Sequence, residues 1–390
     1  MGGVNGEAMD YLINKFNEEN TDGITVEAVY QGEYDDTINK LKSAQIGNMG
    51  ADLVQIYDIG TRFMIDSGWV IPMQELINAD GYDISRIEPN IAAYYTVNNE
   101  LYSMPFNSST PILYYNKDMF EKAGITETPQ TLEDLLDVCQ KLKDAGITPI
   151  SAGNYDMIMR YPAFKAFRME GNDFIDNARM GKEKFNSETG IATAQYAQNI
   201  AQYFSEGWTS SDATAQMDLF LNSGAAMLYT GTWDTPDLAD DEGKLKDDIS
   251  MFKLPVDSEG TATGENDYYA NCGIGTAILK DSMSDMMKDF ISYVWDNYAD
   301  TAMYEFNMLP SMMPSDADKL PELTQQILSD LENCGTFAQC WDVRLDPSTN
   351  EVYRKELASL GMGESTPEEF CENMDKAVAQ YASDYFDTEE

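Results

Sequence analysis

Apolar residues recur at intervals of three and four along much of the chain, which is the spacing of one helix face. Such stretches cover residues 4–20, 34–46, 60–67, 128–146, 187–206, 212–222, 284–298 and 366–385. Two of them begin with helix-start signals: Thr131 precedes Asp134 by three residues, and Thr366 directly precedes Pro367. Gly146 marks the end of the first of these two helices. The pattern therefore predicts a chain rich in amphipathic helices.

Short, strongly apolar runs lie between these helices and are typical of strands. They cover residues 24–30, 51–58, 225–231, 249–255 and 272–279. The run 51–58 is almost continuously apolar, as buried parallel strands are. Because strands and helices alternate, we expect βαβ units, a parallel sheet and an α/β fold class.

The length of the chain indicates more than one core. Its 390 residues are too many for one ordinary core and sufficient for two lobes. An apolar content of 43% and an aromatic content of 11% are typical of a globular protein. No apolar run is long enough to span a bilayer, and the first residues lack the basic and apolar regions of an export signal. Either the protein is cytosolic or its export signal has been removed.

The charge balance and the missing histidine exclude several kinds of chemistry. The chain carries 68 acidic and 25 basic residues, a net charge of −43, which disfavours binding to nucleic acid or to anionic lipid. The absence of histidine removes Ser-His-Asp and Cys-His catalysis and every His-ligated metal site. The sequence also contains neither GxGxxG nor GxxxxGK[ST]. We expect no metal, no cofactor and no nucleic-acid partner.

The five cysteines give no sign of a metal or redox motif. Cys139, Cys272, Cys334, Cys340 and Cys371 show no CxxC spacing, and we expect most of them to be buried free thiols. Cys334 and Cys340 are close enough in sequence for a disulfide between them to stay open.

Six segments occur in an order that resembles a known family. They are KFNEENTDGITVEAVYQGEYDDTINKLKSA, ADLVQIYDIGT, PFNSSTPILYYNKDMFEKAG, TLEDLLDVCQKLKDAGITPI, FLNSGAAMLYTGTWDTPDL and TPEEFCENMDKAV. The most specific element runs from Tyr115 to Gly124. Together they resemble the family-1 extracellular solute-binding proteins of ABC importers, over nearly the whole chain. The resemblance implies a two-lobe periplasmic-binding-protein-like α/β fold, with a central β-sheet in each lobe and a hinged cleft.

The resemblance also implies where the lobes begin and end. The N-terminal lobe would comprise residues 1–110 and 272–312, and the C-terminal lobe residues 111–271 and 313–390. The chain would cross between them near Thr110–Tyr114, Tyr269–Gly275 and Leu309–Pro314. The polar cluster Asn107, Ser108 and Ser109 would then end the first lobe at the cleft.

The function implied by the resemblance is that of a receptor, not an enzyme. It would capture a carbohydrate, most simply an oligosaccharide, and deliver it to the permease subunits of an ABC transporter. It would act as a monomer at the extracellular face of the cell membrane, lipid-anchored or periplasmic. Two other classes stay open: a glycoside hydrolase with two catalytic carboxylates, and a protein-interaction module.

Two ligand classes also stay open. QIYDIGT and PFNSSTPILYYNKD resemble glycerol-3-phosphate-binding proteins, which makes glycerol-3-phosphate or a glycerophosphodiester the alternative ligand. AAMLYTGTWDTPDL and CWDVRLDP resemble oligosaccharide binders, whose sites use aromatic platforms and hydrogen-bond acceptors. In the glycerol-phosphate binders an Arg at the position of Arg344 contacts phosphate, but a Tyr stands where this chain has Met308. That departure favours the sugar.

Twelve residues are candidates for contact with the ligand. We expect Trp233 and Trp341 to be aromatic platforms, although either Trp could instead be a core residue. Because Tyr57 and Asp58 point to opposite faces of a strand, only one can face the cleft, and we choose Asp58. The expected ligand-binding residues are Tyr34, Asp58, Asn107, Ser108, Ser109, Tyr155, Trp233, Asn271, Gly273, Trp341, Asp342 and Arg344.

Overall fold

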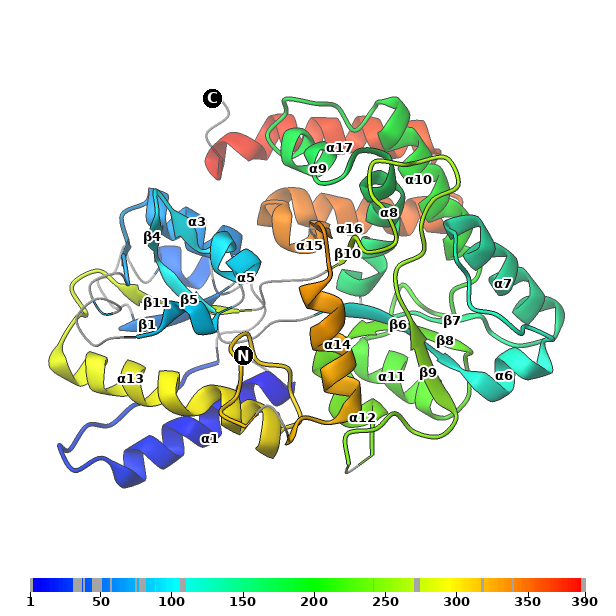
Figure 1. The fold of residues 1–390 in the computed structure, drawn as a ribbon. Helices are drawn as coiled ribbons and strands as arrows, with labels where there is room; N and C mark the ends of the chain where they lie inside the picture. Colours follow the sequence, from blue (N-terminus) through cyan, green and yellow to red (C-terminus); the bar gives the residue numbers. More distant parts are fainter. Residues whose placement is uncertain are drawn as a thin grey trace.

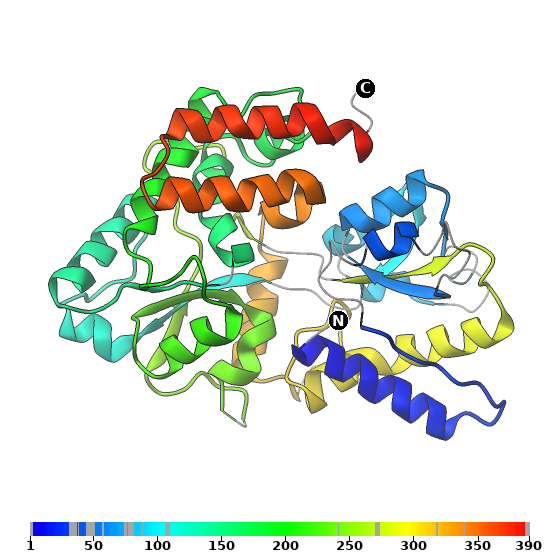
Figure 2. The same ribbon diagram turned by 180° about the vertical axis from the view of Figure 1, so that it is seen from behind.

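The chain forms two lobes that lie side by side, each built around its own sheet (Figures 1 and 2). This computed structural model describes residues 3–30, 37, 39–43, 51–56, 58–73, 76, 82–87, 89–105, 110–153, 155–240, 242–269, 274–316, 319–338 and 340–386. Among these residues, no helix is long and apolar enough to cross a membrane.

The first lobe combines the beginning of the chain with a later excursion. Its elements are α1 (Gly3–Glu19), β1 (Leu53–Ile56), α3 (Asp58–Asp66), β2 (Val70–Ile71), η1 (Ile84–Arg86), α5 (Pro89–Tyr94), β3 (Thr96–Val97), β4 (Glu100–Leu101), β5 (Ser103–Pro105), β11 (Gly275–Leu279), α13 (Asp285–Asp300) and the π-helix η3 (Thr301–Glu305).

Strand β11 is the centre of the first lobe's sheet and separates two cores. It pairs with β1, β2 and β5, and every one of these pairings is antiparallel. Successive side chains of a strand point to opposite faces. Accordingly, Ile278 packs in the core formed with α1 and α13, whereas Ala277 and Leu279 pack in a smaller core with Met64 of α3. Figure 1 shows α1 and α13 below this sheet and α3 above it.

The second lobe contains the remaining elements. They are β6 (Pro111–Asn116), α6 (Lys117–Lys122), α7 (Leu132–Asp144), β7 (Ile150–Ser151), α8 (Tyr155–Glu170), α9 (Asp173–Ala178), α10 (Glu188–Ala201), α11 (Ala213–Leu221), β8 (Met227–Gly231), η2 (Thr232–Asp234), α12 (Thr235–Leu238), β9 (Ile249–Phe252), β10 (Tyr268–Tyr269), α14 (Glu322–Glu332), β12 (Phe337–Ala338), α15 (Trp341–Arg344), α16 (Pro347–Gly361), α17 (Pro367–Tyr381) and η5 (Ala382–Asp384).

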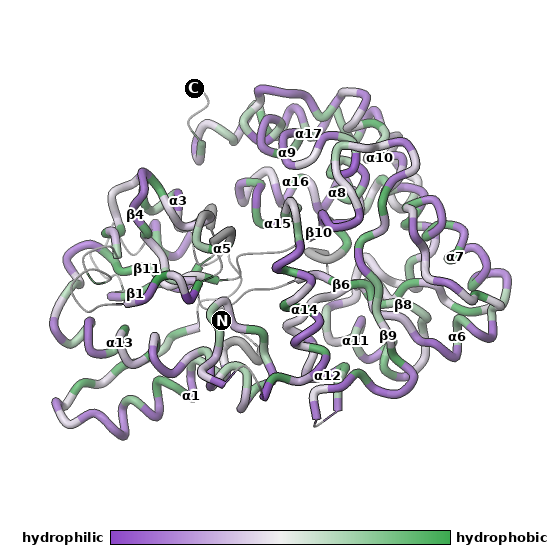
Figure 3. Tube along the Cα trace, viewed as in Figure 1, coloured by the Kyte–Doolittle hydropathy of each residue, from purple (hydrophilic) through white to green (hydrophobic). Residues whose placement is uncertain are grey.

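The sheet of the second lobe has the order β7-β8-β6-β9 and lies in the protein's largest core. Strand β6 pairs antiparallel with β8 and β9, while β7 pairs parallel with β8. All residues of β8 are buried, as expected for a strand that is covered on both faces. Figure 3 shows apolar residues concentrated along the strands and on the inner sides of the helices. The predicted two-lobe α/β fold class is confirmed by this architecture and its structural relatives described below.

The predicted parallel sheet is wrong, because most pairings among the described strands are antiparallel. An almost continuous apolar run reports burial on both faces. It does not report strand direction, which is set by the partner strand.

The strand predicted for residues 24–30 is also absent, although these residues are described. Their backbone groups bind to side chains of α1 in place of a neighbouring strand. The Asn17 amide donates to the Val26 carbonyl and accepts from the Val26 N–H, both at 2.8 Å, and Asn20 makes the same pair of bonds with Ile24 at 2.9 Å.

The predicted helix starts are confirmed where cap residues mark them. Thr131 and Asp134 form a reciprocal capping box at the start of α7, and Thr366 forms another with Glu369 at the start of α17. Gly146 follows the end of α7 with φ of +72°, a backbone conformation that glycine adopts without strain.

Candidate functional site

The chain passes between the lobes at places that lie close together. Strand β5 ends at Pro105 in the first sheet, and β6 begins at Pro111 in the second; β10 ends at Tyr269 and β11 begins at Gly275. Residues Pro111 to Tyr114 already pair within the second lobe, so the first crossing precedes them. A third passage runs through Ser311, whose hydroxyl donates to the Pro105 carbonyl.

Trp233 lies beside the first crossing, in the turn that follows β8. The neighbouring Thr232 N–H donates to the Thr110 carbonyl at 3.1 Å, and the Thr110 N–H donates to the Thr232 hydroxyl at 3.2 Å. These bonds fix the turn to the point where the chain enters the second lobe. Trp233 itself is only partly buried, so part of its ring is available at this junction.

Three contacts hold the Trp233 ring in place. The ring folds over Gly231, where a Cβ atom would come within 2.2 Å of Trp233 Cζ3, so only glycine fits. The Arg160 guanidinium carbon lies 5.6 Å from the ring centroid, within the range of a cation–π contact. The indole also donates to Asp234. Burial raises the pKa of this carboxyl, and hydrogen bonds from Thr230 and Trp233 act in the opposite direction.

Arg160, which the sequence did not single out, forms a buried ion pair with Asp342. Its Nε and Nη2 atoms donate to the two carboxylate oxygens at 2.8 and 2.7 Å, and each side chain is about 5% exposed. Burial acts to lower the pKa of Arg160, but the charge of Asp342 outweighs it, so the pKa is raised. Both oxygens of Asp342 are therefore engaged, which corrects its expected role as an open acceptor for sugar hydroxyls.

Trp341 occupies the core of the second lobe. It is 2% exposed, stacks on Phe174 with ring centroids 5.7 Å apart, and meets the edges of Phe185 and Tyr353. Because α15 places the neighbouring Asp342 against Arg160, the Trp341 ring points into the packed interior. The expected platform role of Trp341 is therefore corrected to a packing role in this structure.

Arg344 forms an ion pair within the second lobe. Its Nη2 atom donates to Asp176 Oδ1 of α9 at 2.7 Å, and Arg179 Nε lies 3.2 Å from the same oxygen. One carboxylate thus compensates part of the charge of two guanidinium groups, and no sequence motif had indicated Asp176 or Arg179.

The other predicted site residues lie at places where the structure gives no side-chain contacts. Asp58 and Tyr155 are the first residues of α3 and α8, and only their backbone is described. Six predicted residues lie outside the described part of the chain: Tyr34, Asn107, Ser108, Ser109, Asn271 and Gly273.

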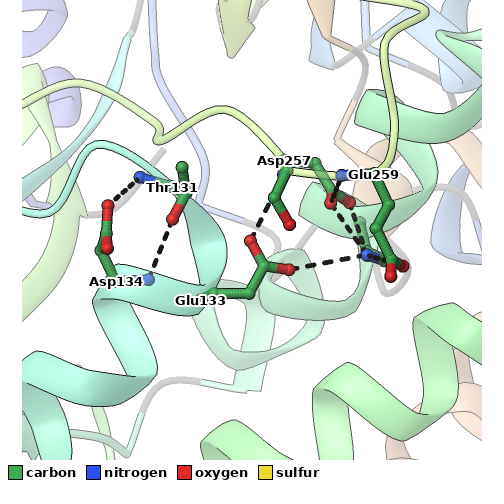
Figure 4. A network of polar contacts seen from close by, with 7 residues as sticks. Thr131, Glu133, Asp134, Asp257 and Glu259 are labelled. Atoms are coloured by element: carbon green, nitrogen blue, oxygen red, sulfur yellow. Dashed lines mark hydrogen bonds and ion pairs between the residues drawn. The ribbon is translucent and has the colours of Figure 1, made fainter.

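A second charged cluster lies on the far side of the second lobe's core and has a structural role. Lys165 Nζ lies 2.7 Å from Asp257 Oδ2, 3.8 Å from Glu133 Oε1 and 3.7 Å from Glu259 Oε2. Figure 4 shows this cluster beside the capping box at the start of α7. It attaches the loop after β9 to α7 and α8.

The described cysteines and acids form no metal site. Cys139, Cys334, Cys340 and Cys371 are free thiols, so Cys334 and Cys340 are not bridged. Within the described part of the chain, no group of three His, Cys, Asp or Glu side chains could hold a metal ion.

Comparison with known proteins connects this geometry to a family. A family model described as bacterial extracellular solute-binding protein matches residues 2–283. The sn-glycerol-3-phosphate-binding periplasmic protein UgpB of Salmonella typhimurium is 38% identical over 154 residues, which cover 38% of this chain. The match spans only about a third, 35%, of that relative's length.

Solved structures share the fold at lower identity. One, described as giving insights into xylan utilization by Caldanaerobius polysaccharolyticus, has a TM-score of 0.82, 23% identity and coverage of 96% and 97% of the two chains. UgpB from Mycobacterium tuberculosis in complex with glycerophosphocholine has a TM-score of 0.74, 18% identity and coverage of 97% and 95%. The resemblance inferred from sequence motifs is confirmed by the family match: the chain belongs to the bacterial extracellular solute-binding protein family.

Proposed function

We propose that this protein is the extracytoplasmic receptor of an ABC importer and that it captures a carbohydrate between its two lobes. The lobes, divided near residues 110, 272 and 312, close on the sugar, and the permease subunits receive it. The receptor acts as a monomer outside the cell membrane, lipid-anchored or periplasmic. Family membership and the two-lobe fold support the receptor class.

The observation that carries the sugar proposal is the placement of Trp233. A partly exposed indole stands at the junction of the lobes, held by Arg160, Gly231 and Asp234. The apolar C–H face of a pyranose packs on such a plate, and a fixed ring loses little entropy on binding. Asp342 and Trp341 support this plate from behind, while the side chains of Asp58 and Tyr155 and the six candidates outside the described residues would complete the contacts.

The charges beside this junction favour a neutral ligand. Arg160 is neutralised by Asp342, and Arg344 shares Asp176 with Arg179. A phosphate needs guanidinium groups that can donate to it as a bidentate pair, and these two are already bound to carboxylates. The net charge of −43 also repels an anionic solute.

The second candidate is glycerol-3-phosphate or a glycerophosphodiester. The observation in its favour is the 38% identity, over 154 residues, to a relative named as an sn-glycerol-3-phosphate-binding protein. In that case Arg344 would leave Asp176 and contact the phosphate. A glycoside hydrolase is the remaining alternative, and release of product from an oligosaccharide would reveal it.

A thermal-shift panel followed by isothermal titration tests the proposal. The panel contains xylo-, chito- and malto-oligosaccharides, galactose, sn-glycerol-3-phosphate and glycerophosphocholine. A ligand at 100 times its Kd adds about 2.7 kcal/mol to the free energy of unfolding and raises the melting temperature. We expect a sugar to do so, with an affinity that hardly changes with salt. Binding of glycerol-3-phosphate with no response to any sugar would establish the second candidate.

A further inference from the structure

A lysine of the first lobe is held between aromatic rings of both lobes. Lys42 Nζ lies 4.5 Å from the ring centroid of Phe63, in its own lobe, and 4.3 Å from that of Tyr385, near the C-terminus. It also lies 3.2 Å from the Tyr385 hydroxyl, to which it donates. The two rings face each other at 5.9 Å between centroids. The ammonium group therefore joins parts of the chain that are 343 residues apart.

The next residue, Phe386, strengthens the same contact. Its ring packs against the main core of the second lobe and against the small core around α3 in the first. The Arg179 guanidinium carbon lies 4.7 Å from the ring centroid, which fixes Phe386 to the second lobe. Val343 of α15 also packs against both cores. Apolar and cation–π contacts thus occur together at this edge.

The segment that carries Tyr385 and Phe386 is rigidly attached to the second lobe. Ala382 is buried in that lobe's core, and its carbonyl accepts from the N–H groups of Tyr385 at 3.0 Å and Phe386 at 2.8 Å. Figures 1 and 2 show the end of α17 extending from its own lobe toward α3, away from the passages between the sheets. Rotation of one lobe about those passages would therefore separate Tyr385 from Lys42.

We propose that residues 382–386 form an interlobe clasp that holds the two lobes together before any ligand binds. Its chemistry is specific: a lysine ammonium between two aromatic faces, backed by Phe386 in an apolar contact. A cation is attracted to the ring faces, and partial burial strengthens that attraction. The clasp raises the fraction of molecules in which the lobes are together.

The clasp has a consequence for affinity, which rests on the proposed function. Apparent affinity is the intrinsic affinity multiplied by the fraction of molecules in the binding-competent state. A clasp that favours approach of the lobes therefore tightens binding without touching the ligand, and its loss weakens binding of any solute.

Small-angle X-ray scattering on the ligand-free protein tests the clasp. We compare the wild type with Lys42→Met, Tyr385→Ala and the double variant. Each single change should raise the radius of gyration and lengthen the distance distribution. The double variant should open the molecule no further than either single change, because both remove the same contact. Lys42→Arg keeps a cation between the rings and should retain the wild-type profile.

The matched control is Lys376→Met, which removes an exposed lysine of α17 whose ammonium contacts only Asn373 among its printed partners. Circular dichroism checks that each variant is folded, and Lys42→Met decides the question alone if Tyr385→Ala does not fold. Wild-type profiles for both single variants, or equal opening by Lys376→Met, would overturn the proposal. Because no sugar is present, this result is separate from any failure of the ligand panel.

Discussion

Two tryptophans that follow similar sequence signals have different surroundings. Trp233 keeps part of its ring exposed at the lobe junction, whereas Trp341 stacks on Phe174 inside the second lobe. Each is followed directly by an aspartate in the sequence. The difference arises from Gly231, which lets the Trp233 ring fold over the strand end, and from Arg160, which pulls Asp342 inward.

Replacing the two tryptophans should separate binding from stability. Trp233→Ala should weaken binding of the sugar identified in the panel by about 1–3 kcal/mol, on the scale of aromatic stacking, with the fold intact. Trp341→Ala should lower the free energy of unfolding by about 3–5 kcal/mol, because it leaves a cavity among aromatic rings. Titration calorimetry and urea unfolding measure the two effects. Unchanged affinity in Trp233→Ala would remove the platform.

The Arg160–Asp342 pair should show the behaviour of a buried ion pair. Arg160→Met alone should cost about 3–5 kcal/mol of stability, because the Asp342 carboxylate would remain buried without its partner. Arg160→Met combined with Asp342→Leu should recover much of that loss. Urea unfolding of the four proteins gives the coupling energy. A double variant as unstable as the sum of the single variants would contradict the pairing.

Arg344 distinguishes the two ligand classes. With a neutral sugar, Arg344→Lys should change affinity little, since a lysine still pairs with Asp176 and contacts no anion. With a phosphate ligand, loss of the bidentate fork should cost about 2 kcal/mol, and binding should weaken steeply with salt. Titration of wild type and variant at low and high salt measures both quantities. We expect the small effect and the flat salt response.

At the scale of single elements, local signals act strongly at helix ends and weakly in strands. The capping boxes of α7 and α17 form at the predicted threonines. By contrast, residues 24–30 have the composition of a strand, yet Asn17 and Asn20 take up their backbone groups. A helix start needs partners within four residues, whereas a strand needs a partner from elsewhere in the chain.

The cap of α17 provides a quantitative test at this scale. Thr366→Ala removes the acceptor for the Glu369 N–H and should lower the free energy of unfolding by about 1 kcal/mol. Glu364→Ala, at an exposed position just before the helix, is the matched control and should have almost no effect. Thermal unfolding of both variants decides the question. Equal losses in the two would show that the cap contributes nothing specific.

At the scale of the whole molecule, binding is a shift in the positions of two lobes. The sheets are joined by short passages, beside which Trp233 stands, while the clasp residues meet at another edge. Contacts that both lobes make only when they are together shift the population toward the compact form.

Saturating sugar should therefore make the molecule more compact. The expected result is a smaller radius of gyration with ligand than without it, and a larger change in Tyr385→Ala, because the clasp variant starts from a more open ensemble. Scattering at matched protein concentrations measures both. Identical profiles with and without a ligand known to bind would remove closure from the mechanism.

The amino-acid sequence by itself determined the helices and their ends, the α/β class and the family. Caps and apolar periodicity act through contacts within a few residues, which any reader of the sequence can follow. Candidate residues at the chain crossings followed from the resemblance, and only Trp233 among those with a described side chain stays partly exposed at the lobe junction.

Only the tertiary structure decided strand direction, the burial of Trp341 and the neutralisation of Asp342. Arg160 lies 182 residues from Asp342, and Lys42 lies 343 residues from Tyr385. No periodicity or cap encodes such pairs. They form because packing two sheets and their helices brings distant side chains together, and burial then makes a charge depend on its partner.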